Sequence, residues 1–296
     1  MRTFLAILLF LLGCPSPAFA WNAAGHRLVA LIAWAQLSPA SREFISGELA
    51  RHPDHARWVA RAAGRGDAAI FAEASTWPDD IRNDPRFFDE TRDPPTPQLA
   101  GYPDMARHKY WHYVDLGRDG QAVEGVIDTE IRRLARLSRS TSKNGQISYD
   151  LPWLIHLVAD LHQPLHVGQH EDEGGNSVTI ENPFNPRLPF PNLHQYWDDL
   201  PGPPWLRGNR LEKKVQRLLS EYSAPKAGNV AVWRDESHAL LARAYPKESG
   251  SLLPIVSEGF HREATAIAEQ RIVDAGYRLG WLLEAEIAAR VSRGTP

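Results

Sequence analysis

Three histidines and an aspartate occupy one short, otherwise apolar segment, as His156, Asp160, His162 and His166. Imidazole and carboxylate groups are common zinc ligands in proteins. His156 and Asp160 are four residues apart, so a helix would place them on one face, where both could reach the same ion. A single buried histidine could equally be a hydrogen-bonded core residue. Four such side chains in one segment favour a metal site.

A proline must interrupt the helix that carries the first two of these side chains. Pro164 has no N–H group, and its ring would collide with the carbonyl group of Asp160, so the helix must kink or stop there. The break can turn His166 toward a different ion from the one that His156 would hold.

The same four-residue spacing recurs at His194 and Asp198, which predicts a second helical turn with one imidazole beside one carboxylate. Other ligand-type side chains stand near aromatic residues, at Trp21 with His26, at Trp77-Pro78-Asp79 and at Trp111-His112-Tyr113-Val114-Asp115. Each of these is weak alone, because His26 could be an ordinary polar helix residue and Asp79 could be an N-cap.

The elements that must position these residues are mostly helices. Apolar residues at helical spacing predict helices over residues 23–37, 39–49, 121–137, 151–162, 211–222, 230–245 and 254–291. Strand signals are scarce, and residues 177–180 could form one arm of a small hairpin. Two proline-rich segments, 83–103 and 183–204, are expected to be ordered surface loops. We therefore expect one mainly α domain with at most a small β-hairpin.

The first 20 residues are expected to be removed. An apolar run over residues 4–12 is followed by a small-x-small site that ends at Ala20, which predicts a secretory signal peptide and a domain spanning residues 21–296. The protein would then be secreted or periplasmic. Residues 11–14 also resemble a lipoprotein signal, with Cys14 as the lipidated residue, but the Ala-Phe-Ala site favours ordinary cleavage. No later apolar run is long enough to span a membrane.

Composition narrows the possible functions. The 296 residues are 43% hydrophobic and include 10 Trp, which is ample for a buried core and argues against disorder. Cys14 is the single cysteine, so a cleaved chain has no disulfide, and bound metal could stabilise it instead. Removing Arg2 with the signal leaves 32 of the 33 basic residues against 36 acidic ones, a net charge of −4. A nucleic-acid binder with this balance would have to carry its positive charge on bound cations.

The ordered motifs resemble the S1/P1 nuclease family, the zinc-dependent single-strand nucleases whose fold is shared with bacterial zinc phospholipase C. From Trp21 to Asp198 the chain contains, in order, an N-terminal Trp, a His five residues on, W-x-D, H-aromatic-x-D, H-x3-D-x5-H with Q-P-L-H, G-G-N and N-L-H-x3-D. The resemblance implies a helical phospholipase C/P1 nuclease-like fold.

The resemblance also implies three zinc ions. One zinc ion would be held by Asp79, His112, His156 and Asp160, a second by His166, His194 and Asp198, and a third by Asp160, His26 and the amine and carbonyl oxygen of Trp21. Only a free terminus supplies that amine, so cleavage after Ala20 would help to build the site. His108, His162 and His170 have no ligand role in the pattern and are expected to be supporting or surface residues.

The activity implied is endonucleolytic hydrolysis of single-stranded DNA and RNA to 5′-phosphate products, with 3′-nucleotidase activity on 3′-mononucleotides. A hydroxide that bridges two zinc ions would be the nucleophile, with Asp160 as the shared carboxylate and no side-chain base. Three divalent ions against three aspartates leave about +3 in the site, which would attract phosphate locally. Arg82 matches a family arginine and would clamp the phosphate, although it could also be a surface helix residue.

The base of the substrate would be recognised beside the zinc ions. By resemblance, Tyr113 would stack on the base, Asp115 would hydrogen-bond its edge and Asn176 would line the pocket. The neighbouring loop is acidic at residues 171–173, where the resemblance implies an apolar residue, so it does not fix the base preference. We expect the protein to act as a monomer.

Two other functions fit parts of the pattern. A zinc phospholipase C shares the N-terminal Trp and the cluster, but its last ligand is characteristically Glu, so Asp198 favours a nuclease. A noncatalytic zinc protein would fill every coordination position with side chains. The three protein ligands expected at the second zinc ion leave a position open, which favours catalysis.

Overall fold

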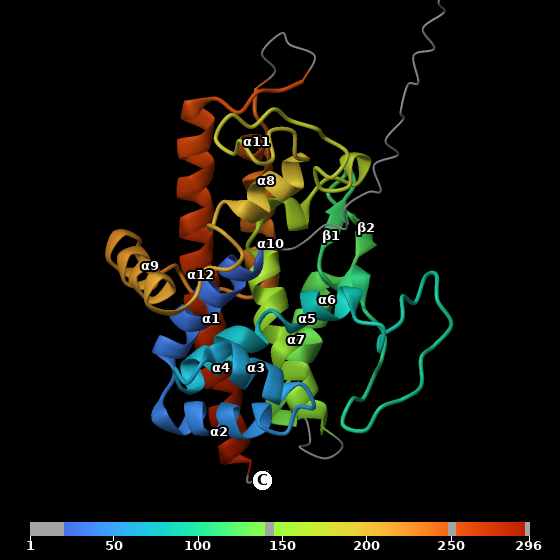
Figure 1. The fold of residues 1–296 in the computed structure, drawn as a ribbon, viewed down its shortest axis with the longest axis vertical. Coiled ribbons are helices and arrows are strands. Elements are labelled where there is room, and N and C mark those ends of the chain that lie inside the picture. Colours follow the sequence, from blue (N-terminus) through green and yellow to red (C-terminus); the bar gives the residue numbers. More distant parts are fainter. Residues whose placement is uncertain (1–20, 140–144, 248–252, 294–296) are drawn as a thin grey trace, which may run out of the picture.

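The structure is a computed structural model that describes residues 21–139, 145–247 and 253–293. The predicted signal peptide, with Cys14, lies outside the described residues. The described helices are α1 (Ala23–Gln36), α2 (Pro39–Leu49), α3 (His55–Ala62), α4 (Asp67–Ala74), α5 (Trp77–Asp80), α6 (Ile127–Leu134), α7 (Gln146–Leu161), α8 (Leu193–Asp199), α9 (Gly208–Glu221), α10 (Val230–Ala239), α11 (Leu241–Ala244) and α12 (Glu258–Ser292). The fold is mainly α, as the sequence predicts (Figure 1).

The long helix α12 runs the length of the molecule (Figure 1). It contributes Ile272, Leu279 and Leu283 to the hydrophobic core, where all three are fully buried. Helix α1 packs along it. The two helices meet closely at Gly276, where a Cβ atom would lie 2.4 Å from Cγ2 of Ile32. Glycine is therefore required there, and the close packing fixes the position of α1 and the side chains that it carries.

Helix α7 passes through the interior beside α1 and α12. Its residues from Ile147 to Leu161 are all buried, which explains why the segment is apolar on every side. The helix ends at Leu161, and Pro164 opens a 3-10 turn, η5 (Pro164–Val167). The predicted break at Pro164 is confirmed.

The predicted strand at residues 177–180 is wrong. The described hairpin pairs β1 (Val114–Leu116) with β2 (Ala122–Gly125) in antiparallel register, whereas Thr179 forms only an isolated bridge with Asn192. Turn geometry explains the difference: Gly125 has φ +78°, and a Cβ atom there would lie 2.2 Å from the backbone oxygen of Tyr113. The predicted helix over residues 121–137 consequently begins only at the start of α6.

Other predicted boundaries also shift. Helix α7 begins at Gln146 rather than Leu151, the segment 230–245 is divided into α10 and α11, and α12 begins at Glu258 rather than Pro254. Helices α3, α4 and α5 were not predicted, because each is too short to show a helical period. Helix α8 lies inside the segment 183–204 that was expected to be a loop, although the spacing of His194 and Asp198 did predict its turn. None of the helices in the described ranges is both long and apolar enough to cross a bilayer.

Candidate metal centre and active site

Ligand-type side chains from six separate places in the chain converge in the interior. They form three groups whose ligand atoms lie within 4.8 Å of one another: His26, His156 and Asp160; Asp79, His112 and His156; and His166, His194 and Asp198. The structure thus brings together all eight of the side chains that the sequence predicted as zinc ligands through an imidazole or carboxylate. The first two groups share His156, so their sites adjoin.

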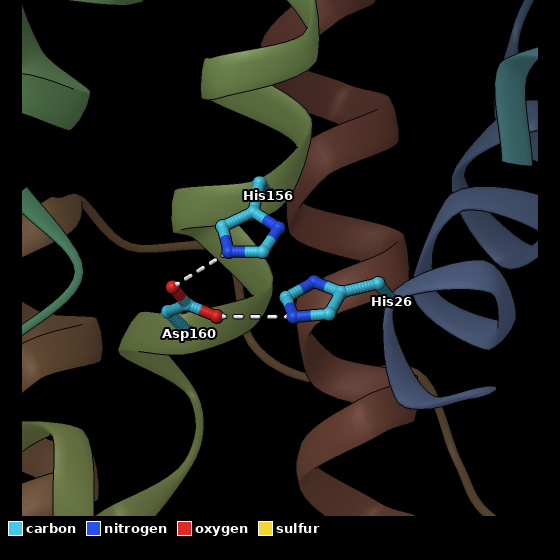
Figure 2. Close-up of side chains that lie close together, drawn as sticks. All are labelled: His26, His156 and Asp160. Atoms are coloured by element: carbon cyan, nitrogen blue, oxygen red, sulfur yellow. Dashed lines mark ion pairs between the residues drawn. The ribbon is translucent and has the colours of Figure 1, made fainter. Parts of the chain in front are cut away.

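Asp160 belongs to the first group and also contacts His112 of the second. Its Oδ1 atom lies 3.3 Å from Nε2 of His26, and its Oδ2 atom lies 3.2 Å from Nε2 of His156 and 3.0 Å from Nδ1 of His112. Figure 2 shows His26 approaching from α1 while His156 and Asp160 project from successive turns of α7. The two carboxylate oxygens face different histidines, which suits a carboxylate shared between two ions.

The third group is formed by residues that follow the end of α7 in the chain: His166 in η5, and His194 and Asp198 in α8. Nε2 of His166 lies 3.1 Å from Nε2 of His194, which in turn lies 3.8 Å from Oδ1 of Asp198. The η5 turn places His166 here rather than beside His156, as the position of Pro164 predicted. Gln163 was not assigned a role from the sequence, yet its side-chain amide donates a 2.9 Å hydrogen bond to Asp198. Its place in the Q-P-L-H motif was the available signal.

Backbone carbonyl groups orient three of these imidazole rings. Nδ1 of His156 lies 2.8 Å from the carbonyl oxygen of Ser75. Nδ1 of His166 lies 2.6 Å from the carbonyl oxygen of His112, and Nδ1 of His194 lies 2.8 Å from the carbonyl oxygen of Gly174. A carbonyl oxygen can only accept, so each Nδ1 must carry the hydrogen. In a neutral ring Nε2 then carries the lone pair, the arrangement seen in histidines that ligate metals.

The buried polar atoms at the centre fit a cation better than they fit one another. Neither ring nitrogen of His26 has a hydrogen-bond partner in the described residues. Nδ1 of His112 lies 3.1 Å from Nε2 of His156, so two ring nitrogens face each other. Buried polar groups are normally satisfied, and an ion between these atoms would satisfy several at once. A set of imidazole nitrogens and carboxylate oxygens is suited to zinc.

Burial shifts the pKa values of five cluster residues in the direction that favours the neutral side chain. It lowers the pKa of His26, His112 and His166 well below the ordinary value. It also raises the pKa of Asp160 to about 6 and that of Asp198 well above its ordinary value. These neutral imidazoles can donate lone pairs, and a bound cation would restore the charge of the carboxylates.

His156 differs from the other cluster histidines. Burial lowers its pKa, but the carboxylates of Asp160 and Asp79 outweigh burial, so the net shift is upward. An opposite charge close by favours the charged form of a side chain. The negative potential that would hold a proton on His156 would also favour a metal cation.

Asp79 and Arg82 form the side of the cluster nearest to solvent. The side chain of Asp79 is 14% exposed and that of Arg82 is 9% exposed, and Nε of Arg82 lies 3.0 Å from Oδ1 of Asp79. The N-cap position of α5 is occupied by Thr76, so Asp79 does not serve as an N-cap. The arginine is thus held beside the cluster rather than on an outer helix surface.

The two residues before α1, Trp21 and Asn22, are anchored next to the group of His166, His194 and Asp198. Trp21 is fully buried, and the backbone N–H of Asn22 donates a 3.1 Å hydrogen bond to the carbonyl group of Asp198. The side chain of Asn22 also donates to Oδ1 of Asp199 at 3.0 Å and to the carbonyl group of Gly202 at 2.8 Å. These contacts anchor the start of α1 to the end of α8.

The predicted substrate residues lie on two segments, residues 113–115 and 174–176, that approach each other at Gly168. Tyr113 directly follows His112 and leads into β1, where Asp115 is 4% exposed. Gly168 lies between β1 and the turn that leads to Asn176, since a Cβ atom there would be 3.4 Å from Oδ1 of Asp115 and 2.6 Å from Cα of Gly174. Asn176 donates a hydrogen bond to the carbonyl group of Glu173.

The three histidines without an expected ligand role lie outside these groups. His162 is fully buried among arginines, and His108 stacks on Trp111 with ring centroids 3.7 Å apart. His170 is exposed and lies close to Asp115 and Glu124.

Comparison with known proteins decides the family. The family model described as S1/P1 Nuclease matches residues 21–288. The chain belongs to the S1/P1 nuclease family. It is therefore a hydrolytic enzyme that acts on the phosphodiester bonds of nucleic acids.

Named relatives in plants and fungi cover most of the chain. Endonuclease 3 of Arabidopsis thaliana is 26% identical over 314 residues, which cover 98% of this chain and 97% of that protein. Nuclease P1 of Penicillium citrinum is 24% identical over 291 residues, which cover 89% of this chain and 97% of that protein. A shorter match to Endonuclease 2 of Arabidopsis thaliana is 38% identical over 88 residues, or 28% of each chain.

Proposed function

We propose that this S1/P1 family member is an endonuclease that uses three zinc ions to cleave single-stranded DNA and RNA to 5′-phosphate products. We also propose that it removes the phosphate of 3′-mononucleotides. The observation that carries the proposal is the set of three adjacent His and Asp groups, two of which share His156. A nuclease with an acidic chain can attract phosphate through such a centre.

The residues would hold the ions as the family pattern implies. Asp79, His112, His156 and Asp160 would hold one, His166, His194 and Asp198 a second, and Asp160, His26 and Trp21 the third. When bound, zinc supplies a water nucleophile that is reactive near neutral pH and positive charge for the phosphate. Asp160 keeps two sites together because its oxygens face different histidines. Gln163 and the carbonyl groups that bind Nδ1 atoms keep the donor atoms aimed inward.

Arg82 would stabilise the phosphate. Its ion pair with Asp79 holds the guanidinium group at the rim of the cluster. A guanidinium group there can donate to a nonbridging phosphate oxygen, and the charge on that oxygen grows in the transition state.

Preference for single strands would follow from the base pocket. Tyr113 directly precedes β1 and Asp115 lies within it, and Gly168 separates Asp115 from Gly174, two residues before Asn176. A base must leave its stack to be stacked on Tyr113 and hydrogen-bonded by Asp115. Bases held in a duplex would therefore be poor substrates.

The start of the mature chain is part of the proposal. Cleavage of a signal peptide after Ala20 would free the amine of Trp21 and send the protein to the periplasm or the medium. The anchoring of Asn22 beside Asp198 supports this, and the family match also begins at Trp21. Native mass spectrometry of the exported protein should give Trp21 as the first residue, a monomer and three zinc ions. Active protein that begins upstream of Trp21, or that lacks transition metal, would contradict the proposal.

Substrate assays separate the proposed activity from that of a phospholipase. We expect rapid loss of single-stranded DNA and RNA, slow loss of a duplex of the same sequence, and phosphate release from a 3′-mononucleotide but not from its 5′ isomer. Phosphatidylcholine should release little phosphocholine. The opposite ranking of nucleic acid and phosphatidylcholine would overturn the proposed function.

A further inference from the structure

A fourth group of ligand-type atoms lies outside the three-part cluster. It consists of Asp115, Glu124 and His170, whose ligand atoms also lie within 4.8 Å of one another. The hairpin register places Asp115 opposite Glu124, and a bridge between Leu116 and Gln169 brings the next residue, His170, alongside. Two carboxylates and one imidazole are thus held together by backbone pairing rather than by chance contact of long side chains.

Asp115 is the unusual member of this group. Its side chain is almost completely buried at 4% exposure, yet no described residue donates a hydrogen bond to its carboxylate. The comparably buried Asp54 instead accepts hydrogen bonds from Trp77 and Arg86. A buried carboxylate without a donor is unfavourable, and a cation would compensate it.

The charges around Asp115 add to this imbalance. Burial first, and then the nearby carboxylates of Glu124, Asp172 and Glu173, raise the pKa of Asp115 to about 7. The basic residue of the hairpin turn, Arg118, is 90% exposed and pairs with Glu171. The rim of the base pocket therefore carries excess negative charge where a polyanionic substrate is expected to approach.

We propose that Asp115, Glu124 and His170 form a fourth divalent-cation site at the rim of the base pocket. The mixed oxygen and nitrogen donors suit zinc or manganese better than calcium or magnesium, which prefer oxygen ligands alone. Glu124 and His170 are exposed, so the ion exchanges with solvent and binds more weakly than the ions of the buried cluster. The site rests on the proposed function only in that its ion would occupy Asp115, the residue expected to bind the base.

Zinc titration followed by native mass spectrometry tests the site without measuring activity. The wild-type protein should bind one more zinc ion than H170A and E124Q, whereas E171Q, which removes a neighbouring carboxylate outside the group, should match the wild type. Burial, and then the carboxylate of Glu124, raise the pKa of the Tyr113 hydroxyl group, so Y113F, which removes this neighbour of Glu124, serves as a second control that should keep the ion. Equal zinc counts in the wild type, H170A and E124Q would overturn the proposal, whether or not the protein is active.

Kinetics test whether the ion competes with the base. At a zinc concentration about ten times the Kd of the site, the KM for a single-stranded oligonucleotide should rise about elevenfold in the wild type and not in H170A. The KM for bis(p-nitrophenyl) phosphate, a diester without a base, should stay constant in both proteins. Equal inhibition with both substrates, or in both proteins, would contradict a site at the base pocket. A failure of the proposed function would look different, because neither substrate would then be cleaved.

Discussion

Two fully buried histidines near the end of α7, His156 and His162, have opposite surroundings. Nδ1 of His162 donates a 2.7 Å hydrogen bond to the carbonyl group of Val158, and its Nε2 accepts from Arg278 at 3.1 Å. His156 has one nitrogen satisfied by Ser75, while the other faces a ring nitrogen of His112. Burial does not distinguish the two histidines, whereas the available partners do.

The residues that surround His156 and His162 differ in the same way as the two histidines. Around His162, Arg278 donates to Glu236, and Arg271 donates to Ser237 and to the carbonyl group of His162. Both arginines are paired with acidic side chains there, although Nε of Arg278 and Nε1 of Trp233 have no hydrogen-bond partner among the described residues. Around His156, imidazole nitrogens and carboxylate oxygens face one another, and neither the ring nitrogens of His26 nor Oδ1 of Asp160 have a hydrogen-bond partner among the described residues. A buried histidine with both ring nitrogens hydrogen-bonded is explained by the fold alone, whereas buried ring nitrogens without a partner indicate a ligand.

The largest expected effect comes from removing the shared carboxylate. D160A should lower the rate of hydrolysis at least about 1,000-fold, or about 4 kcal/mol, because two ions lose a ligand. Zinc content, measured by atomic emission, should fall with it. D150N changes another buried aspartate of the same helix and should keep both zinc and activity. Full activity in D160A would show that the carboxylate is not shared.

Removing the ions should affect stability almost as strongly. Ions that bind only the folded state stabilise it, so chelation should lower Tm by about 10 °C or more. Differential scanning fluorimetry with and without chelator measures this. An unchanged Tm would mean that the cluster is not integral to the fold.

The two histidines can be compared directly by substitution. H156A should lose zinc and activity, whereas H162A should keep its zinc and lose about 2 to 3 kcal/mol of unfolding free energy, because Arg278 and the Val158 carbonyl lose a buried partner. Zinc content and urea unfolding of each variant measure the two effects. Loss of zinc in H162A equal to that in H156A would remove the distinction between the regions.

The smallest expected effect is a change in pH dependence. Burial, and then Arg271 and Arg278, lower the pKa of His162 well below its ordinary value. Below pH about 6.5 the unfolded chain therefore takes up a proton that the folded chain does not, and stability falls as the pH falls. Replacing this histidine in H162Q should make the slope shallower by about 1.4 kcal/mol per pH unit, as measured by urea unfolding of chelated protein. Parallel slopes for H162Q and wild type would show that His162 is not buried in its neutral form.

Local sequence pattern was sufficient for several elements. Helices α1, α2 and α9 were predicted to within a few residues, because each has an apolar face that repeats along its own length. The position of the hairpin was not predictable in this way, since it depends on the positive φ of Gly125 and on packing against Tyr113. The short helices α3 to α5 were not predictable from hydrophobic periodicity, because they contain too few turns to show a period.

The sequence by itself determined which side chains can bind metal and how they pair within a helix. His156 with Asp160, and His194 with Asp198, follow from a spacing of four residues, and the break at Pro164 follows from proline chemistry. The family motif separated His156 from His162, but only the tertiary structure decided which side chains surround each of them, including the arginines around His162. The physical reason is that a side chain's partners come from distant parts of the chain, which only the packing of α1, α10 and α12 around α7 brings into contact.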